Sequence, residues 1–277
     1  MRMLLDLFII LLAVYLIVLL LVYFGQSRLM YFPQRQLTHT PATIGLPYEE
    51  VAIPTEDGET LHGWWVPAEA AKGTVLLFHG NAGNISHRIN YLTMFRQLGY
   101  HTLLFDYRGY GQSSGTPSES GLYQDAQAVW RYLTDTRGIA ASQIILFGES
   151  LGAAVATWLA ARAEPGLLVL TSTFTSVPEL AAEIYPFLPV RWICRLQYDT
   201  LSLLPSVSSP VFIAHSPQDE VVPFQHSQRL LQAAAGPKQF LPLEGSHNIG
   251  FIFMQPSWIR ALGAFMDSHL TIDQTKP

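Results

Sequence analysis

The stretch QIILFGESLGAAVATWLAARA, residues 143–163, joins an apolar run to an alanine-rich run through a short turn flanked by glycines. Residues 143–147 lack polar alternation, which is typical of a strand buried on both faces, and residues 151–163 are typical of a buried helix. Between them, residues 148–152 (GESLG) match the pattern GxSxG. A serine between a strand and a helix exposes its Oγ at the apex of a sharp turn, so Ser150 is a candidate nucleophile.

A second stretch, residues 111–115 (GQSSG), matches the same pattern. It follows a loop and leads to Pro117, so it lacks the strand before the serine and the helix after it. We interpret it as a glycine-rich turn. The alternative for Ser150 itself is a simple helix N-cap after a buried strand.

Outside this stretch, short β-rich runs alternate with helical patterns, and this order predicts an α/β domain. From the third run onward the strands alternate with helical stretches, which favours a mostly parallel eight-stranded sheet with helices on both faces. Strands are expected at residues 49–54, 61–66, 74–79, 102–107, 143–147, 167–170, 211–214 and 239–243. Helices are expected at residues 85–98, 118–136, 151–163, 223–235 and 257–269.

The composition limits the class of protein. The chain has 277 residues, of which 49% are hydrophobic and 13% charged, and its formal net charge is -5. This balance argues against a disordered chain and against a nucleic-acid partner, and the length suits one domain with a full core. Cys194 is the single cysteine, so an intrachain disulfide is excluded and the chain fits a reducing or an oxidising compartment.

The N-terminus predicts a membrane anchor. Leu7 to Phe24 contains no charged residue, and a helix of that length rises about 27 Å, close to the thickness of a hydrocarbon core. Residues 4–24 are therefore expected to lie in a bilayer as a single-pass anchor, and the alternative is a cleaved signal peptide ending near Ser27. We expect an anchor at residues 1–27, an extended tether at 28–48 and a catalytic domain at 49–277. The side of the membrane stays open.

A serine hydroxyl needs a base and a group that orients the base. In this type of fold the acid and then the histidine follow the serine along the chain. Asp219 follows the expected strand 211–214, with Asp199 as the fallback, and His247 lies in a loop after the expected strand 239–243. His226 and His269 fall in expected helices. The predicted triad is therefore Ser150, Asp219 and His247.

Hydrolysis of an ester also develops a negative oxygen that needs amide donors. The backbone N–H of Leu151 follows the candidate nucleophile, and the N–H of Asn81 lies in the glycine-containing loop after the third expected strand. These two groups are the predicted oxyanion hole. Metal-ligand spacing and a glycine-rich phosphate loop are not recognisable, so no metal and no cofactor are expected.

Taken together, residues 79–81 (HGN), 106–111 (DYRGYG), 148–152, Asp219 and His247 resemble the α/β-hydrolase superfamily over about residues 49–270. The apolar N-terminus, residues 29–33 (LMYFP), 79–88 and 172–176 (STFTS) resemble its single-pass, membrane-anchored members. The resemblance implies the same triad and the same oxyanion hole. Some of those members remove palmitate from protein thioesters and carry a cysteine-rich N-terminus, whereas this chain has no cysteine before Cys194.

Residues 174–209, where the fold usually inserts a cap, are rich in apolar side chains. A short apolar cap favours a substrate with a hydrophobic acyl group. The alternative is that these side chains pack at the edge of the sheet. They are Leu180, Ile184, Tyr185, Phe187, Leu188, Trp192, Ile193 and Leu196.

The sequence thus predicts a membrane-anchored serine hydrolase that cleaves ester or thioester bonds through an acyl-enzyme on Ser150. The expected partners are a small-molecule or lipid-like acyl substrate and the bilayer. A serine peptidase of the same fold and a non-catalytic membrane-tethered binding or scaffold protein are the alternatives. The physiological substrate, the acyl chain length and the oligomeric state stay open.

Overall fold

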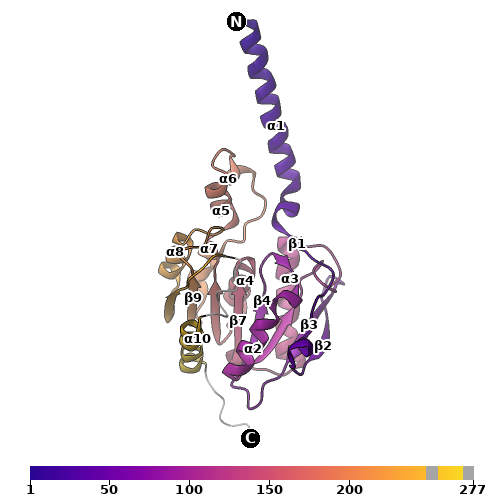
Figure 1. Cartoon of the computed structure of the whole chain (residues 1–277), viewed down its shortest axis with the longest axis vertical. Coiled ribbons are helices and arrows are strands. Elements are labelled where there is room, and N and C mark those ends of the chain that lie inside the picture. Colours follow the sequence, from indigo (N-terminus) through magenta and orange to yellow (C-terminus); the bar gives the residue numbers. More distant parts are fainter. Residues whose placement is uncertain (248–254, 271–277) are drawn as a thin grey trace.

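One mixed sheet organises the computed structural model of this chain, which describes residues 1–247 and 255–270 (Figure 1). Within the described residues the sheet has eight strands in the order β10-β9-β8-β7-β4-β6-β3-β2. β2 pairs antiparallel with β3, β3 pairs antiparallel with β6, and every other neighbouring pair is parallel. The strands are β2 (Glu49–Pro54), β3 (Thr60–Val66), β4 (Thr74–Phe78), β6 (His101–Phe105), β7 (Ile144–Glu149), β8 (Leu167–Thr171), β9 (Val211–His215) and β10 (Lys238–Pro242).

Helices cover both faces of the sheet (Figure 1). The side chains of β4 alternate between two cores: Leu76 and Phe78 belong to one, and Val75 and Leu77 belong to the other. α3 (Glu119–Arg131), α4 (Leu151–Ala163) and α8 (Gln225–Ala233) pack on the first core, and α2 (Ile89–Leu98) and α10 (Pro256–His269) pack on the second. The predicted eight-stranded, mostly parallel sheet with helices on both faces is confirmed.

Short helical turns complete the connections. They are η1 (Pro41–Ile44), η2 (Ile85–Arg88), η3 (Tyr132–Thr136), η4 (Ala141–Gln143) and η5 (Leu204–Ser206). Residues 271–277, the end of the predicted domain, lie outside the described residues.

α1 (Arg2–Met30) stands away from the sheet, and none of its residues is buried (Figure 1). It has 29 residues, and its length and apolar composition are sufficient to cross a membrane. The helix continues three residues beyond the predicted end at Ser27.

The segment after α1, where we expected an extended tether, is hydrogen-bonded to the domain. β1 (Phe32–Pro33) pairs in parallel with β5 (Ala82–Gly83), and the Phe32 and Gln34 amides donate to loop carbonyls at 3.0 Å. Asn84 Nδ2 donates to the carbonyls of Gln34 and residue 36, at 3.0 and 2.8 Å. Backbone pairing of this kind leaves no hydrophobic period in the sequence, which is why the composition suggested only a linker.

Residues 174–209 leave the sheet as α5 (Val177–Ile184), α6 (Val190–Ile193) and α7 (Thr200–Leu203), and Figure 1 shows α5 and α6 rising beside α1. Leu180 and Leu196 pack against the first core. This agrees with the alternative that the apolar side chains of this segment pack at the edge of the sheet. Four other apolar side chains are exposed: Ile184 by 46%, Tyr185 by 48%, Phe187 by 68% and Trp192 by 90%. Packing on the sheet therefore explains only part of this segment.

α4 begins in direct contact with β7 and β4, and two glycines permit that approach. A Cβ at Gly152 would lie 2.1 Å from the Phe78 carbonyl oxygen, and a Cβ at Gly148 would lie 2.3 Å from Ala153 Cα. Both obstacles are backbone atoms, so they cannot rotate away. The position of α4 against the sheet depends on these two glycines.

We expect Gly152→Ala to lower the free energy of unfolding of the full chain in detergent by about 2 kcal/mol or more, because the added methyl group overlaps backbone. Gly25→Ala is the matched control, since a Cβ there meets nothing within 4 Å. Denaturant unfolding measures both variants. Equal stability of Gly152→Ala and wild type would contradict the close approach.

Candidate active site

Ser150 occupies a strained backbone conformation at the carboxyl end of β7. Its φ is 52° and its ψ is -115°, a combination that L residues avoid and that costs about 1–3 kcal/mol. The Ser150 amide donates to the Thr171 carbonyl at 2.9 Å, and Thr173 Oγ1 donates to the Ser150 carbonyl at 2.9 Å. The turn between strand and helix is therefore held from both sides, with the serine at its apex.

Asp219 and His247 lie next to each other after the strands that the sequence identified. Asp219 follows β9, His247 follows β10, and β9 and β10 are parallel neighbours. His247 Nδ1 and Asp219 Oδ2 are 2.7 Å apart, the His247 side chain is 10% exposed, and the Asp219 carboxylate is fully buried. Because a carboxylate only accepts, Nδ1 donates the proton, so in the neutral imidazole the lone pair is on Nε2.

The carboxylate of Asp219 accepts from three further donors. The Val221 and Val222 amides donate to Oδ1 at 2.9 and 2.7 Å, and His215 Nε2 donates to Oδ2 at 3.1 Å. Burial alone would raise the pKa of Asp219, but the hydrogen bonds from His215 and His247 and the charge of His247 outweigh it and hold that pKa below its usual range. Asp219 therefore stays ionised and fixes the orientation of His247.

His215 is a residue of the site that our sequence reasoning missed. It is the last residue of β9, fully buried, and its Nε2 also donates to the Val222 carbonyl at 3.0 Å. His215 precedes Asp219 by four residues in the sequence. Whether its side chain faces the core or the solvent depends on the pleat of β9, and the sequence pattern did not reveal it. Glu220 was missed as well, and its Oε2 accepts from the His247 amide at 3.1 Å.

The strand order brings Ser150 to the same edge of the sheet as the Asp219 and His247 pair. β7, β8, β9 and β10 are consecutive parallel neighbours, and all three residues follow carboxyl ends of these strands. In the described part of the chain, Ser150 Oγ makes no hydrogen bond to a side chain.

The remaining candidates fall elsewhere. Asp199 caps α7 by accepting from the Ser202 amide at 3.1 Å. His226 is bonded to Thr175 at 2.8 Å, and His269 contacts the carbonyl of residue 265 on its own helix. Each of these three side chains thus has a structural partner elsewhere, and none of them is needed to explain the group of residues around Ser150.

The loop after β4 carries Asn81 at its turn. Tyr110 donates to the Asn81 carbonyl at 2.8 Å, the Phe32 amide donates to it at 3.0 Å, and Asn81 Nδ2 donates to the Met30 carbonyl at 2.9 Å. Neither the Asn81 amide nor the Leu151 amide donates a backbone hydrogen bond within the described residues outside regular strands and helices. The loop is thus fixed to the end of α1, and both predicted oxyanion donors are available.

Glu149, the residue before the serine, contacts α2 and the turn that precedes it. Its carboxylate accepts from Tyr91 at 3.0 Å and lies 3.3 Å from Arg88 Nε. Burial acts to lower the pKa of Arg88, but the charge of Glu149 outweighs it and that pKa is raised. We assign Glu149 to holding the turn in place.

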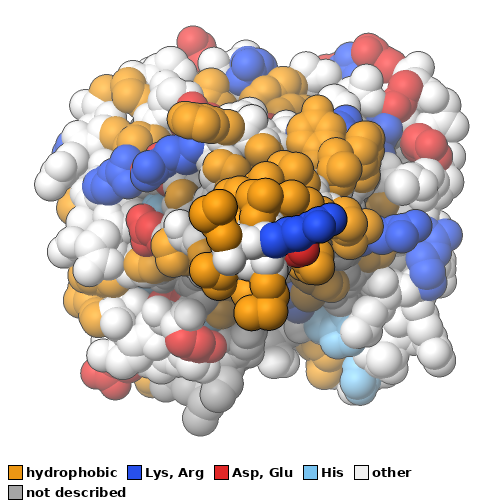
Figure 2. All heavy atoms as spheres, turned by 90° about the horizontal axis from the view of Figure 1, so that it is seen from above, with side chains coloured by type: hydrophobic (Ala, Val, Ile, Leu, Met, Phe, Trp, Pro, Cys, Tyr) orange, Lys and Arg blue, Asp and Glu red, His pale blue; other side chains and the backbone are white. Residues whose placement is uncertain are grey.

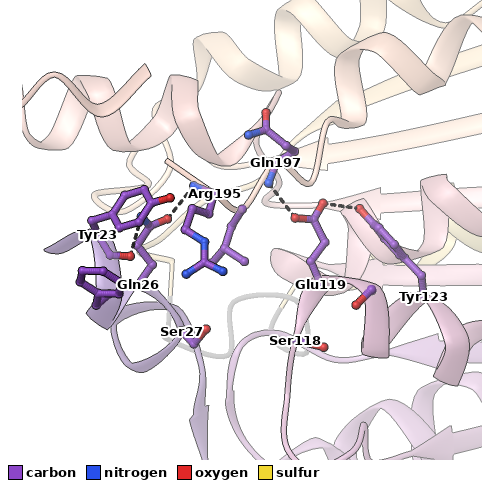
Figure 3. Close-up of a pocket in the computed structure, with 11 residues that line it drawn as sticks. Tyr23, Gln26, Ser27, Ser118, Glu119, Tyr123, Arg195 and Gln197 are labelled. Carbon is purple, nitrogen blue, oxygen red and sulfur yellow. Dashed lines mark hydrogen bonds between the residues drawn. The ribbon is translucent and has the colours of Figure 1, made fainter. Parts of the chain in front are cut away.

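A cavity of about 490 Å³ lies at a different place, where α1, α3 and the cap segment meet (Figure 3). Figure 3 shows Glu119 between Gln197 and Tyr123, with Arg195 beside Tyr23. The residues that line this cavity include none of the predicted triad. They are Tyr23, Phe24, Gln26, Ser27, Ser118, Glu119, Ser120, Tyr123, Arg195, Leu196 and Gln197.

We expect the buried carboxylate of Asp219 to make folding depend on pH. A carboxylate with a depressed pKa stabilises the fold above its unfolded pKa of about 4, and this contribution is lost as the pH falls through the folded pKa. Wild type should exceed Asp219→Asn in unfolding free energy by about 2 kcal/mol at pH 7, and the difference should shrink below about pH 4. Denaturant unfolding over a pH series measures this. Asp199→Asn is the matched control, and a constant difference from pH 7 to pH 3 would refute the assignment.

Several known proteins are similar to this chain in sequence. The family described as serine aminopeptidase, S33, matches residues 69–197. The alpha/beta hydrolase domain-containing protein WAV2 of Arabidopsis thaliana is 34% identical over 214 residues, which cover 71% of this chain and 70% of WAV2. An uncharacterized membrane protein of Saccharomyces cerevisiae is 34% identical over 218 residues, 76% of each chain.

A solved structure shares the fold. The Pyrococcus furiosus esterase Pf2001 superimposes with a TM-score of 0.73 at 22% identity, covering 87% of this chain and 100% of that one. The resemblance to α/β-hydrolases led us to expect this fold, a mostly parallel eight-stranded sheet with helices on both faces. The chain belongs to the α/β-hydrolase superfamily.

Proposed function

We propose that this protein is a membrane-anchored serine hydrolase that cleaves carboxylic ester or thioester bonds of acyl substrates through an acyl-enzyme on Ser150. The observation that carries the proposal is the 2.7 Å hydrogen bond between His247 Nδ1 and the buried Asp219. It leaves Nε2 of His247 as a base at the edge of the sheet where the strained Ser150 stands. The esterase Pf2001 with the same fold is consistent with this reaction class.

In the first half of the reaction, His247 Nε2 takes the proton of Ser150 Oγ while Oγ attacks the acyl carbon. The tetrahedral intermediate collapses when the bond to the leaving alcohol or thiol breaks, and His247 returns the proton to the leaving group. In the second half, His247 takes a proton from a water while that water attacks the acyl carbon. The bond between Ser150 Oγ and the acyl carbon then breaks, His247 returns the proton to Oγ, and the acid departs. Asp219 holds the imidazole in the tautomer that both halves need.

The oxygen that becomes negative in both intermediates is assigned to the Leu151 and Asn81 amides. Leu151 N–H lies at the start of α4, where the helix dipole also favours negative charge. Asn81 N–H is held in place because the Asn81 carbonyl accepts from Phe32 and Tyr110. Donors fixed in advance in this way stabilise developing charge without reorganisation during the reaction.

Membrane anchoring is supported by α1. Leu7 to Phe24 is free of charged residues, every residue of α1 is at least partly exposed, and the Saccharomyces cerevisiae relative is called a membrane protein. A helix with this much apolar surface in contact with water would be costly, whereas a bilayer accommodates it. We propose that α1 crosses the membrane and holds the hydrolase domain at its surface.

A serine peptidase is the second candidate, because the matching family is described as a serine aminopeptidase. The same triad cleaves amides, and the chemistry of the substrate pocket decides between the two reactions. The exposed apolar residues of α5 and α6 favour an acyl group over a charged peptide terminus.

We expect Ser150→Ala to reduce kcat for p-nitrophenyl esters by about 10⁴-fold or more, since it removes the nucleophile. Steady-state hydrolysis by the full chain in detergent, from acetyl to palmitoyl esters, measures this. Cys194→Ala is the control and should keep wild-type kcat. If Ser150→Ala and wild type are equally inactive on every ester, the non-catalytic scaffold alternative replaces our proposal.

Aminoacyl p-nitroanilides separate the two enzymatic candidates in the same assay. We expect the full chain to hydrolyse acyl esters with a kcat/KM at least about 100-fold above that for the anilides, which corresponds to about 2.7 kcal/mol of transition-state discrimination. Turnover of anilides that matches the esters and depends on Ser150 would favour the peptidase instead.

The oxyanion assignment distinguishes the backbone of Asn81 from its side chain. We expect Asn81→Ala to change kcat by less than about tenfold, because the backbone N–H is retained and only the bond to the Met30 carbonyl is lost. The same ester assay gives kcat. A loss of about 10²-fold or more, typical of a deleted oxyanion donor, would assign that role to the Asn81 side chain.

A further inference from the structure

The loop between α5 and α6 reaches α1 far above the sheet. We call residues 184–190 (IYPFLPV) the cap tip. Tyr15 Oη donates to the Phe187 carbonyl at 3.1 Å, which joins the cap tip to the middle of the uncharged run of α1. Figure 1 shows α5 and α6 beside α1, above the sheet and toward the N-terminus of the chain.

The helix provides a measure of depth. Tyr15 lies nine residues before Phe24, so its Cα is about 13 Å further along the helix axis. Because Tyr15 Oη contacts the Phe187 carbonyl, Phe187 lies at about the depth of Tyr15, to within the length of a tyrosine side chain. If α1 spans a bilayer as proposed above, the cap tip lies below the headgroups, within the leaflet on the side of the hydrolase domain.

The surface of the cap tip suits that environment. Ile184, Tyr185 and Phe187 are exposed by 46% to 68%, and Trp192 in α6 is exposed by 90%. The cap tip contains no charged residue. Figure 2, which looks onto the N-terminal side of the molecule, shows hydrophobic side chains gathered where α1 points toward the viewer.

The charged residues that flank the cap tip have partners on the side of the domain. Glu183 lies 3.6 Å from His226 Nε2 on α8, and Arg191 donates to Glu179 in the first turn of α5 at 3.0 Å. Both pairs involve residues outside the cap tip, so residues 184–190 between them carry no charge.

The backbone of the cap tip is also nearly free of unpaired donors. Pro186 and Pro189 have no N–H, and the Tyr185, Leu188 and Val190 amides donate to backbone carbonyls at 2.8 to 3.0 Å. Unpaired N–H groups are costly in hydrocarbon but not in water.

Contacts at the base of the cap fix its position relative to α1. Gln26 Nε2 donates to the Ile193 carbonyl at 2.8 Å, and the Arg195 amide donates to Gln26 Oε1 at 2.7 Å. The Arg195 guanidinium lies 5.5 Å from the centre of the Tyr23 ring, and Figure 3 shows these side chains together. Tyrosine and arginine at this level are typical of the membrane interface.

We propose that the cap tip inserts into the leaflet next to α1, so that lipid acyl chains cover Phe187 and Trp192. This inference rests on the membrane anchoring proposed above and not on the catalytic assignment. It gives the domain a second membrane contact, and it sets the cap of the hydrolase among acyl chains from which a lipid-like substrate could enter.

Fluorescence quenching in vesicles tests the proposal. In the full chain carrying Cys194→Ser, a single cysteine is introduced by Phe187→Cys, Leu16→Cys or Glu69→Cys and labelled with an environment-sensitive dye. Leu16 lies in α1, and Glu69 follows β3 at the opposite end of the sheet from Ser150. The labelled proteins are reconstituted in phosphatidylcholine vesicles that contain lipids with a spin label on the acyl chain.

We expect quenching at position 187 to be comparable to that at position 16 and several-fold greater than that at position 69. Quenching at 16 but not at 187 would overturn the insertion of the cap tip and leave the anchor intact. Absence of quenching at both positions would overturn the anchor and the cap insertion together. A blue-shifted emission at 187 without lipid quenching would mean that a second copy of the chain covers the tip, which also overturns the proposal.

Discussion

The close approach of α4 to β7 and β4 is the constraint on which the rest of the site depends. Gly148 and Gly152 have no Cβ, so the first turn of α4 can touch backbone atoms of both strands. The chain can make so short a turn only if Ser150 adopts a φ of 52°. The strain is tolerated because the Thr171 and Thr173 contacts and the buried core around α4 hold the turn. As a result, Ser150 is held at the carboxyl end of β7, a central strand of a rigid sheet.

Parallel strand order supplies the remaining groups at the same edge. β9 and β10 are neighbours beyond β8, so the residues that follow them meet there. The fully buried carboxylate of Asp219 would be unfavourable without its donors, and His215, His247 and the Val221 and Val222 amides compensate for the lost water. The same interactions that keep Asp219 ionised also orient His247. Stability and proposed chemistry are therefore coupled at one carboxylate.

α1 and the candidate active site are joined through the loop after β4. β1 pairs with β5, and Asn81 bonds to Met30 through its side chain and to Phe32 through its carbonyl. A displacement of the end of α1 would move the proposed oxyanion donor with it. α1 and the cap are bonded to each other as well, through Gln26 and Tyr15. The domain is thus held to α1 at two places.

The sequence predicted the parts of this fold that depend on local pattern. The buried strand and helix around Ser150, the eight strands and their mostly parallel order, and the pairing of Asp219 with His247 all followed from periodicity, turn residues and chain order. Three features could not be found in this way, because each depends on which way backbone or side chain faces in three dimensions. They are the inward direction of His215, the backbone pairing of β1 with β5, and the exposure of Phe187 and Trp192 at the end of the cap.

The most direct test of the central claim is to label the full chain with a fluorophosphonate and locate the adduct by peptide mass spectrometry. The account predicts a single modification, on the peptide that carries Ser150, and a strongly reduced labelling rate in His247→Ala. The other GxSxG serine, Ser113, is fully buried and donates to the Asp106 carbonyl, so it should stay unmodified. An adduct on Ser113 or on any residue other than Ser150, or no adduct at all, would contradict the account.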